Sequence, residues 1–156
     1  MKILGIDPGY ERLGIAILEK KEKEVLVFSE CFKTSTKLEF SERLFLIGKR
    51  LEEIIKKYKP DILSIETLFF TTNQKTAMRV AETRGLIIYL AKKFNLEIFE
   101  ITPLQVKIAT TGYGKATKDQ VMKMIKMLIK IDKSKKSDDE LDAIAIALTA
   151  SVNKKL

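Results

Sequence analysis

The sequence predicts an α/β fold built on a five-stranded mixed β-sheet flanked by helices. In chain order it has three short apolar segments with polar connections, two helical patterns that alternate with two further apolar segments, and two final helical patterns. Short polar connections are typical of antiparallel strands, whereas helical crossovers join parallel ones. We therefore expect the first three strands to pair antiparallel, and the first, fourth and fifth to pair parallel. No linker or repeat interrupts this order, so residues 1–156 are expected to form a single domain.

The first three strands are expected at residues 2–7, 13–18 and 24–32. The first strand is apolar and ends at Pro8-Gly9, and the charged residues 19–23 follow the second. Both features favour a turn over a continued strand.

The middle of the chain alternates helices with strands. Apolar residues at helical spacing predict a helix over 37–58, which the capping-box pattern Thr36-x-x-Glu39 precedes and Pro60 ends. A strand, a long helix and a strand then follow, at residues 61–66, 76–94 and 96–101.

The remainder of the chain is expected to be helical. The fifth strand is closed by Thr102-Pro103, and two capping-box patterns come later, Thr117-x-x-Gln120 and Ser137-x-x-Glu140. These patterns predict two last helices, near 118–130 and 138–152.

Composition excludes several kinds of catalytic site. The chain has no His and a single Cys, Cys31, so it can form neither a Ser-His-Asp triad nor a Cys-His pair, and no His- or Cys-based zinc site. A metal site must use oxygen ligands, which favours Mg²⁺ or Mn²⁺. The 24 Lys and 5 Arg outnumber 21 acidic residues to give a net charge of +8, which favours a polyanionic partner.

The sequence also favours a soluble, cytoplasmic protein. Its first residues reach charged Asp7 and a Pro-Gly turn too early for a signal peptide. The longest run without charge, residues 143–153, is too short to span a bilayer.

Two carboxylates are expected to meet at one edge of the sheet. Asp7 ends the first strand and Glu66 ends the fourth, and a right-handed crossover through helix 37–58 would place these strands side by side and parallel. Ligands of open α/β sheets bind at the carboxyl ends of strands, where the connections diverge. Taken singly, Asp7 is also explained as a turn residue and Glu66 as a solvated strand end.

A second pair of carboxylates lies at the start of the last helix. Asp139 and Asp142 are three residues apart and share a helix face, and Asp138 with Asp142 is a competing pair. Asp138 and Asp139 are also explained by the preference of a helix N-terminus for negative charge, but Asp142 lies one turn inside an apolar helix. Carboxylates about 4 Å apart repel by about 4 kcal/mol at an effective dielectric constant near 20, a cost that divalent cations would remove.

Several motifs resemble the RuvC-type Holliday junction resolvases, a family of the RNase H-like superfamily. The resemblance covers nearly the whole chain, and its most specific parts are Gly112-x-Gly114-x-Ala116-x-Lys118-x-Gln120-Val121 and Asp139-x-x-Asp142-Ala-Ile-Ala-Ile-Ala147. The other matching residues are Gly5-Ile-Asp-Pro-Gly9, Ile65-Glu66 with Phe69 and Asn73, Arg84-Gly85, and Gln105-Val-Lys107. The chain departs from the family at Ala150, where relatives often carry His.

The resemblance implies roles for the carboxylates. It makes Asp7, Glu66, Asp139 and Asp142 the catalytic and metal-binding residues of an RNase H-like fold. The family spacing Asp-x-x-Asp makes Asp139, not Asp138, the metal ligand that accompanies Asp142. Asp138 would then cap the helix or lie outside the direct metal ligands.

The resemblance also implies residues that contact DNA. Lys107 and Lys118 match catalytic lysines near the scissile phosphate, and Phe69 matches an aromatic beside the junction centre. Asn73 and Lys115 complete the implied DNA-binding set. Without the resemblance, the lysines would be interpreted as solvated surface residues and Phe69 as a core or interface aromatic.

The activity that the resemblance implies is that of a Mg²⁺-dependent crossover junction endodeoxyribonuclease in homologous recombination and DNA repair. Such an enzyme resolves four-way DNA junctions by paired symmetric nicks that leave 5′-phosphate ends. Two Mg²⁺ ions per subunit, roughly 3.5–4 Å apart, would serve phosphodiester hydrolysis, with Mn²⁺ as a substitute. The implied partners are four-way junction DNA, a second copy of the chain in a homodimer, and branch-migration ATPase and junction-binding subunits of the RuvB and RuvA types.

Two further patterns concern these partners. Residues 115–136 carry eight Lys and two Asp, a net +6 of the total +8, and we interpret them as contacts to DNA phosphates rather than as a solvated face. On the helix over 76–94, Ala77, Ala81 and Gly85 recur every four residues beside apolar Met78 and Tyr89. This ridge suits the close approach of a dimer partner, as the family implies, or of the protein's own sheet.

Three rival interpretations explain the sequence less well. An RNase H-like nuclease of the YqgF type, which processes ribosomal RNA, does not account for residues 112–121. A non-catalytic junction-binding protein does not account for the four acids. A fragment of an actin-like ATPase would lack the second lobe that encloses ATP.

Overall fold

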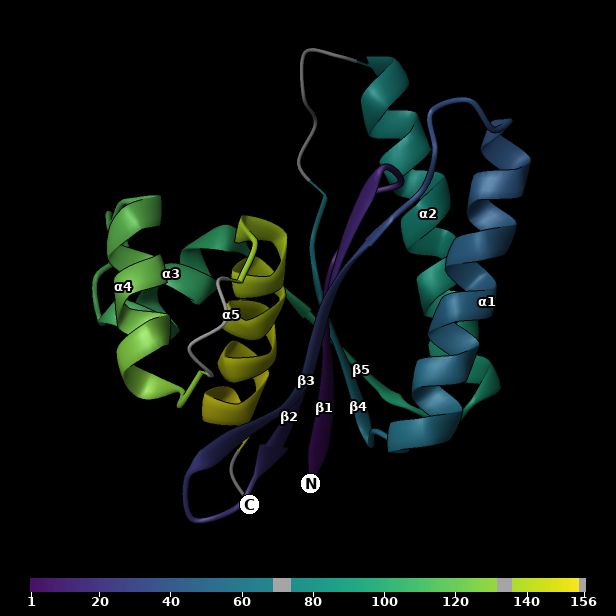
Figure 1. Cartoon of the computed structure of the whole chain (residues 1–156). Helices are drawn as coiled ribbons and strands as arrows, with labels where there is room; N and C mark the ends of the chain where they lie inside the picture. Colours follow the sequence, from purple (N-terminus) through teal and green to yellow (C-terminus); the bar gives the residue numbers. More distant parts are fainter. Residues whose placement is uncertain (69–73, 132–135, 155–156) are drawn as a thin grey trace.

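The computed structural model describes residues 1–68, 74–131 and 136–154, which build a mixed sheet with helices on both faces (Figure 1). The strand order is β3-β2-β1-β4-β5. β1 pairs antiparallel with β2 and β2 with β3, whereas the β1–β4 and β4–β5 pairs are parallel. The predicted mixed sheet and its strand pairing are therefore confirmed. The strands span Lys2–Asp7 (β1), Arg12–Lys20 (β2), Glu24–Lys33 (β3), Ile62–Glu66 (β4) and Glu97–Ile101 (β5).

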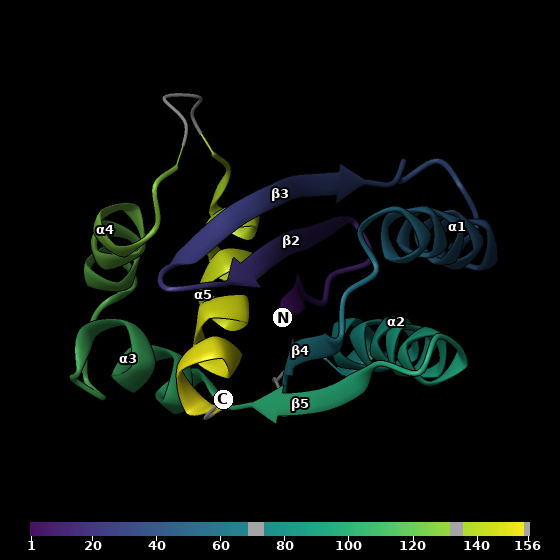
Figure 2. The same cartoon turned by 90° about the horizontal axis from the view of Figure 1, so that it is seen from below.

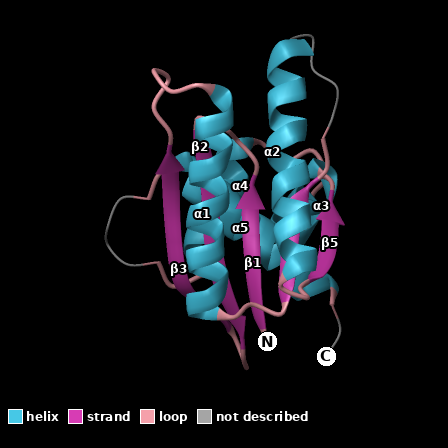
Figure 3. Cartoon of the chain, turned by 90° about the vertical axis from the view of Figure 1, so that its right-hand side faces the viewer, coloured by secondary structure: helices cyan, strands magenta, loops and turns pink. Residues whose placement is uncertain are grey.

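The helices form layers on the two faces of the sheet. Helices α1 (Phe40–Tyr58) and α2 (Gln74–Lys93) lie side by side across one face (Figure 3). Helix α5 (Asp138–Asn153) covers the other face, with α3 (Pro103–Thr111) and α4 (Lys118–Leu128) on its outer side (Figure 2). No helix in the described ranges is long and apolar enough to cross a membrane.

Alternating side chains of the central strands supply two hydrophobic clusters. Ile3 and Ala16 pack with α4 and α5 on one face, while Leu4 and Ile17 pack with α1 and α2 on the other. Because successive residues of a strand point to opposite faces, a strand covered on both sides is apolar throughout. This explains why β1 and β2 read as continuous apolar segments.

Helix α5 approaches the sheet closely because the strands beneath it carry glycine. A Cβ atom on Gly5 would lie 2.3 Å from the carbonyl oxygen of Ala143 and 2.7 Å from Cβ of Ala147. A Cβ atom on Gly14 would lie 2.1 Å from the carbonyl oxygen of Asp139. The first turns of α5 are thus held against β1 and β2, close to the carboxyl end of β1.

The predicted start of the first helix is wrong. Helix α1 begins at Phe40, and its N-cap is Glu39, whose side chain makes no capping hydrogen bond. The expected capping box at Thr36 does not form, because Thr36 lies inside a turn that the Leu38 amide closes by donating to the Ser35 carbonyl oxygen at 3.2 Å. The helix therefore begins three residues later than the sequence predicts.

A helix was also missed between β5 and α4. Thr102 is the N-cap of α3, with Pro103 in its first turn and a complete capping box to Gln105. The Thr102-Pro103 pair that closes a strand is equally suited to open a helix, because proline fits the first helical position. In the described residues after β5, the chain therefore forms three helices and not the expected two.

The other predicted ends agree with the structure to within a few residues. Thr117 and Ser137 form the expected capping boxes of α4 and α5. Helix α1 ends at Tyr58, followed by Lys59 in the left-handed conformation (φ 49°) and then Pro60. Proline disfavours helical geometry in the residue before it, so Pro60 limits the helix as predicted.

The small residues on α2 do not face the protein's own sheet. The buried residues of this helix are Thr83, Ile87, Leu90 and Ala91. Ala81 and Gly85 are exposed, and nothing lies within 4 Å of the position that a Cβ on Gly85 would occupy. Packing against the sheet therefore does not explain Ala81 and Gly85, whereas Ala77, the third residue of the ridge, is half-buried.

Candidate active site

The ends of two parallel strands bring the first two carboxylates together. Ile6 on β1 and Ile65 on β4 are paired across the parallel ladder, so the next residue on each strand, Asp7 and Glu66, lies at the same edge of the sheet. Connections leave this edge in different directions, to the β1–β2 turn and towards α2. This is the position at which open α/β sheets bind ligands.

The first turns of α5 bring the other two carboxylates to the same edge. Asp7 pairs with Gly14 across the β1–β2 ladder. A Cβ on Gly14 would lie 3.1 Å from Cβ of Asp7 and 2.1 Å from the carbonyl oxygen of Asp139. Asp139 and, one turn later, Asp142 are thereby placed beside the strand ends.

Burial and the neighbouring acids together change the ionisation of Asp7. Burial, followed by the negative charges of Asp142, Glu66 and Asp139, raises the pKa of Asp7 from 3.8 to about 7, against a smaller opposite effect of Lys118. A buried carboxylate surrounded by others resists losing its proton. The site thus concentrates negative charge that positive groups would stabilise.

Burial and neighbouring carboxylates also raise the pKa values of Glu66 and Asp142. Burial and then the charge of Asp142 raise the pKa of Glu66. Burial also raises the pKa of Asp142, even though the Lys118 ammonium donates a hydrogen bond to its Oδ2 atom at 2.9 Å. One lysine therefore compensates only part of the repulsion.

Two residues not identified from the sequence contact Asp139. The Arg12 guanidinium donates from both Nε, at 2.9 Å, and Nη2 to Oδ2 of Asp139. The Cys31 thiol donates to the same oxygen at 3.6 Å, and burial together with the charge of Asp139 raises the pKa of this thiol. The only sequence signal for Arg12 is its place directly after the turn that follows Asp7, and that signal is weak.

Another arginine supports the end of β4. Arg84, on α2, donates from Nε to the carbonyl oxygen of Glu66 at 3.1 Å and pairs with Glu100. The sequence motif that contains Arg84 was identified, but its contact with the backbone of Glu66 was not predicted.

The donor chemistry of the site fits hard divalent cations, which prefer oxygen ligands. In the described part of the chain, no three carboxylate or thiol side chains are gathered closely enough to hold a metal ion. Asp139 contacts Arg12 and Asp142 contacts Lys118. Beside Glu66, the buried Thr67 hydroxyl has no hydrogen-bond partner among the described residues. Such a group is suited to a bound water or ligand.

The remaining predicted site residues lie at varying distances from the carboxylates. Asp138 is exposed in the first turn of α5, outside the capping box. Lys107 is half-buried on α3 and Lys115 is exposed before α4, and neither ammonium makes an ion pair with the four acids in the part of the chain that the structure describes. Phe69 and Asn73 lie outside the described residues.

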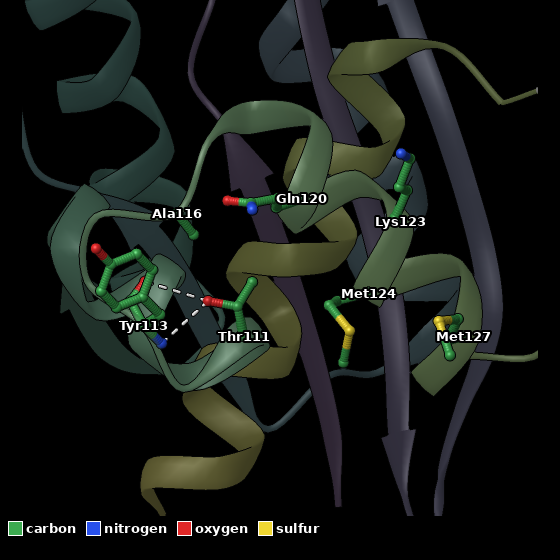
Figure 4. Close-up of a pocket in the computed structure, with 7 residues that line it drawn as sticks. All are labelled: Thr111, Tyr113, Ala116, Gln120, Lys123, Met124 and Met127. Atoms are coloured by element: carbon green, nitrogen blue, oxygen red, sulfur yellow. Dashed lines mark hydrogen bonds between the residues drawn. The ribbon is translucent and has the colours of Figure 1, made fainter.

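A separate apolar groove of about 390 Å³ lies on the outer side of α4 (Figure 4). Its walls contain none of the four acids, and the α4 residues that line it differ from Val121, Met122 and Ile125, which face α5. The groove is therefore distinct from the carboxylate site. It is lined by Thr111, Tyr113, Ala116, Gln120, Lys123, Met124 and Met127.

Comparisons of sequence identify relatives along the whole chain. The sequence pattern of the RuvC family, described as crossover junction endodeoxyribonuclease, matches residues 3–150. A curated relative, the crossover junction endodeoxyribonuclease RuvC of Thermosipho melanesiensis, is 44% identical over 153 residues, which are 97% of this chain and 98% of that protein.

Comparisons of structure agree. The T. thermophilus RuvC solved in complex with Holliday junction substrate has a TM-score of 0.91 and 30% identity, over 97% of this chain and 93% of that one. The yeast mitochondrial Holliday junction resolvase, at 16% identity and a TM-score of 0.72, covers 96% of this chain and 77% of that one and shares the fold. The RNase H-like fold is thus confirmed, and with the family pattern matched over residues 3–150 this chain belongs to the RuvC family of crossover junction endodeoxyribonucleases.

Proposed function

We propose that this chain resolves four-way Holliday junctions by paired symmetric nicks, in homologous recombination and DNA repair. The observation that supports this proposal is the convergence of Asp7, Glu66, Asp139 and Asp142 on one edge of the sheet. Four carboxylates that repel one another suit two Mg²⁺ ions, or Mn²⁺ in their place. When bound, these ions would supply an activated water for attack on phosphorus and stabilise the leaving 3′ oxygen.

The chain's own residues hold and surround this chemistry. Two strand ends and one helix end carry the four acids, so the backbone fixes their positions before substrate arrives. Lys118, hydrogen-bonded to Asp142, would supply an ammonium that stabilises the additional negative charge of a phosphate in the transition state. The proposed hydrolysis would leave a 5′-phosphate and a 3′-hydroxyl, ends that a ligase can join.

The lysine-rich segment is suited to binding the DNA backbone. Five lysines of its described part are exposed, Lys115, Lys118, Lys123, Lys126 and Lys130, whereas Lys136 is half-buried and pairs with Glu140 at 3.5 Å. Contacts to phosphates give an affinity that falls steeply as salt rises. We therefore expect junction binding by this segment to weaken with salt in the same way for different junction sequences.

Resolution requires two equivalent cuts, which a two-fold homodimer can deliver with paired sites. The exposed ridge on α2, with Ala81 and Gly85, offers a surface for the second copy. Branch migration would be the task of separate partners, an ATPase of the RuvB type and a junction-binding protein of the RuvA type.

The test is incubation of the purified chain with four-way DNA junctions, duplex DNA and RNA hairpins, in Mg²⁺ and then in EDTA. Paired symmetric nicks in the junction alone, abolished by EDTA, are the expected result. Cleavage of the RNA hairpins instead would favour an RNA-processing nuclease and contradict the proposal.

Two isosteric variants test the site assignment. Glu66→Gln and Asp142→Asn should each retain junction binding while losing nicking, because each removes one negative charge at nearly constant shape. Electrophoretic mobility shift and nicking assays on the same samples separate the two properties. Persistent nicking in both variants would show that the acids have been assigned wrongly.

A further inference from the structure

The Asp139 carboxylate is held by a residue outside the four-carboxylate group. Arg12 donates to Oδ2 from Nε, at 2.9 Å, and from Nη2. The Cys31 thiol donates to the same atom at 3.6 Å. All three contacts therefore end on Oδ2, and Oδ1 receives none of them.

The geometry of the sheet explains how Arg12 reaches Asp139. Side chains alternate along a strand, so Arg12 lies on the same face of β2 as Gly14 and Ala16. Ala16 packs in the cluster formed with α5, and Gly14 lies beneath the backbone of Asp139. Cys31 is the cross-strand partner of Gly14 on β3. Arg12 is thus the first of these three β2 residues on the face that α5 covers, and it lies beside the first turn of that helix.

We propose that Arg12 is a positioning residue of the nuclease site, which holds Oδ2 of Asp139 so that Oδ1 is presented to a divalent cation. This rests on the proposed function, because it requires a cation at the carboxylates. A guanidinium that donates twice from a planar fork fixes the orientation of a carboxylate better than an ammonium does.

Arg12 affects cation binding in two opposite ways. Its positive charge repels a cation, whereas its fork restricts Asp139 to one orientation. The side chains of Arg12 and Asp139 are 51% and 21% exposed, so water and salt screen the repulsion. Loss of a partner that orients a metal ligand typically lowers metal affinity about 10–100-fold. The positioning effect therefore dominates.

The decisive variant is Arg12→Lys, which keeps the charge and removes the fork. Mn²⁺ binding to the full chain is measured without DNA, by the loss of the free Mn²⁺ signal in electron paramagnetic resonance. We expect about tenfold weaker binding, and weaker binding also in Arg12→Gln. Melting curves in EDTA establish that each variant is folded, so that the affinities compare folded proteins. Affinity equal to or higher than that of the wild type in both variants would overturn the proposal.

Arg50→Lys is the matched control. Arg50 on α1 also makes two ion-pair contacts, to Glu30 at 2.9 Å and to Glu53 at 3.0 Å, but it lies on the helix layer opposite α5. Removing this fork should leave Mn²⁺ affinity unchanged. A tenfold loss in the control as well would show that the effect does not act through Asp139.

A double-mutant cycle tests the route of the effect. If Arg12 acts through Asp139, Arg12→Lys should cause no further loss of Mn²⁺ affinity in an Asp139→Asn background. In nicking assays, the single variant Arg12→Lys should need about tenfold more Mg²⁺ for half-maximal rate and should reach the wild-type rate at saturating Mg²⁺. A lower rate at saturating Mg²⁺ with an unchanged requirement would contradict positioning.

The failure of this inference is separable from that of the proposed function. Normal Mn²⁺ binding by the wild type without nicking of any junction would overturn the function alone. Failure of the wild type to bind Mn²⁺ would overturn both.

Discussion

Asp7 ionises with difficulty because it is buried among carboxylates, and its pKa is raised from 3.8 to about 7. The folded state therefore holds the Asp7 proton more tightly than the unfolded state does. By proton linkage, stability falls as pH rises from about 4 to about 7, and the full cost is present above that range. This cost is at most about 4 kcal/mol, since one pKa unit corresponds to about 1.4 kcal/mol.

Asp7→Asn should therefore stabilise the protein in EDTA at pH 8 and have little effect near pH 4. Urea unfolding at the two pH values gives the free energies of unfolding. Mg²⁺ at pH 8 should stabilise the wild type more than it stabilises the variant. Glu22→Gln, an exposed charge in the β2–β3 turn, is the control and should show neither effect. An equal stabilisation by Asp7→Asn at both pH values would contradict the assignment.

The structure also distinguishes the two candidate catalytic lysines. Lys118 contacts Asp142 at 2.9 Å, whereas Lys107 makes no such contact among the described residues. Lys118→Met should slow single-turnover nicking about 100-fold, the usual effect of losing one donor that stabilises transition-state charge. Lys107→Met should slow it less than about tenfold. Junction affinity, measured by fluorescence anisotropy, shows whether a loss of rate reflects weaker binding. An equal loss of nicking rate in both variants would contradict the larger role that we assign to Lys118.

At the residue scale, the carboxylates could be predicted because their positions follow from local patterns. Asp7 and Glu66 end apolar strands, Asp139 lies inside the recognisable capping box Ser137-x-x-Glu140, and Asp142 follows it. The contact of Arg12 with Asp139 joins residues 127 positions apart. This contact depends on the register of β2 and on the close approach of α5 to β2 at Gly14. Local sequence patterns reveal neither of these.

At the scale of elements, Gly14 determines how closely the first turn of α5 approaches β2. Gly14→Ala would place a Cβ 2.1 Å from the carbonyl oxygen of Asp139, so the helix must move. We expect a loss of about 1–3 kcal/mol in the free energy of unfolding and a strong loss of nicking, because Asp139 moves with the helix. Urea unfolding and nicking assays on the same variant measure both.

Gly48→Ala is the matched control for this substitution. A Cβ at Gly48, inside α1, would lie 3.5 Å from Leu86, an ordinary contact. Alanine favours a helix over glycine by about 0.5–1 kcal/mol, so this variant should be slightly more stable and fully active. Full activity in Gly14→Ala would show that the closeness of α5 is not needed for the site.

The elements themselves could largely be predicted because apolar periodicity and turn residues agree along most of the chain. The exceptions arise where one sequence pattern is compatible with two different local structures. Thr102-Pro103 suits both the end of β5 and the start of α3, and the nine residues of α3 are too few for periodicity to decide. Thr36 matches a capping box, but it lies inside the turn that the Leu38 amide closes on the Ser35 carbonyl oxygen, before the helix begins.

At the scale of the whole molecule, the exposed face of α2 is the surface that we expect to form the homodimer. Met78 on this face is 66% exposed, and Ala81 and Gly85 beside it leave room for a helix of the second copy. A charge at the centre of such an apolar contact would be buried without a partner, which strongly opposes association. Met78→Glu should therefore shift the protein from dimer to monomer while the monomer stays folded.

Met127→Glu is the matched control, because Met127 is also an exposed helical methionine (79%) but lies on α4. Light scattering at micromolar concentration, without DNA, should give the dimer mass for the wild type and Met127→Glu and the monomer mass for Met78→Glu. On junctions, the monomeric variant should nick the two strands independently, because no second site is held in register with the first. A dimer that survives Met78→Glu would exclude this face of α2 as the interface.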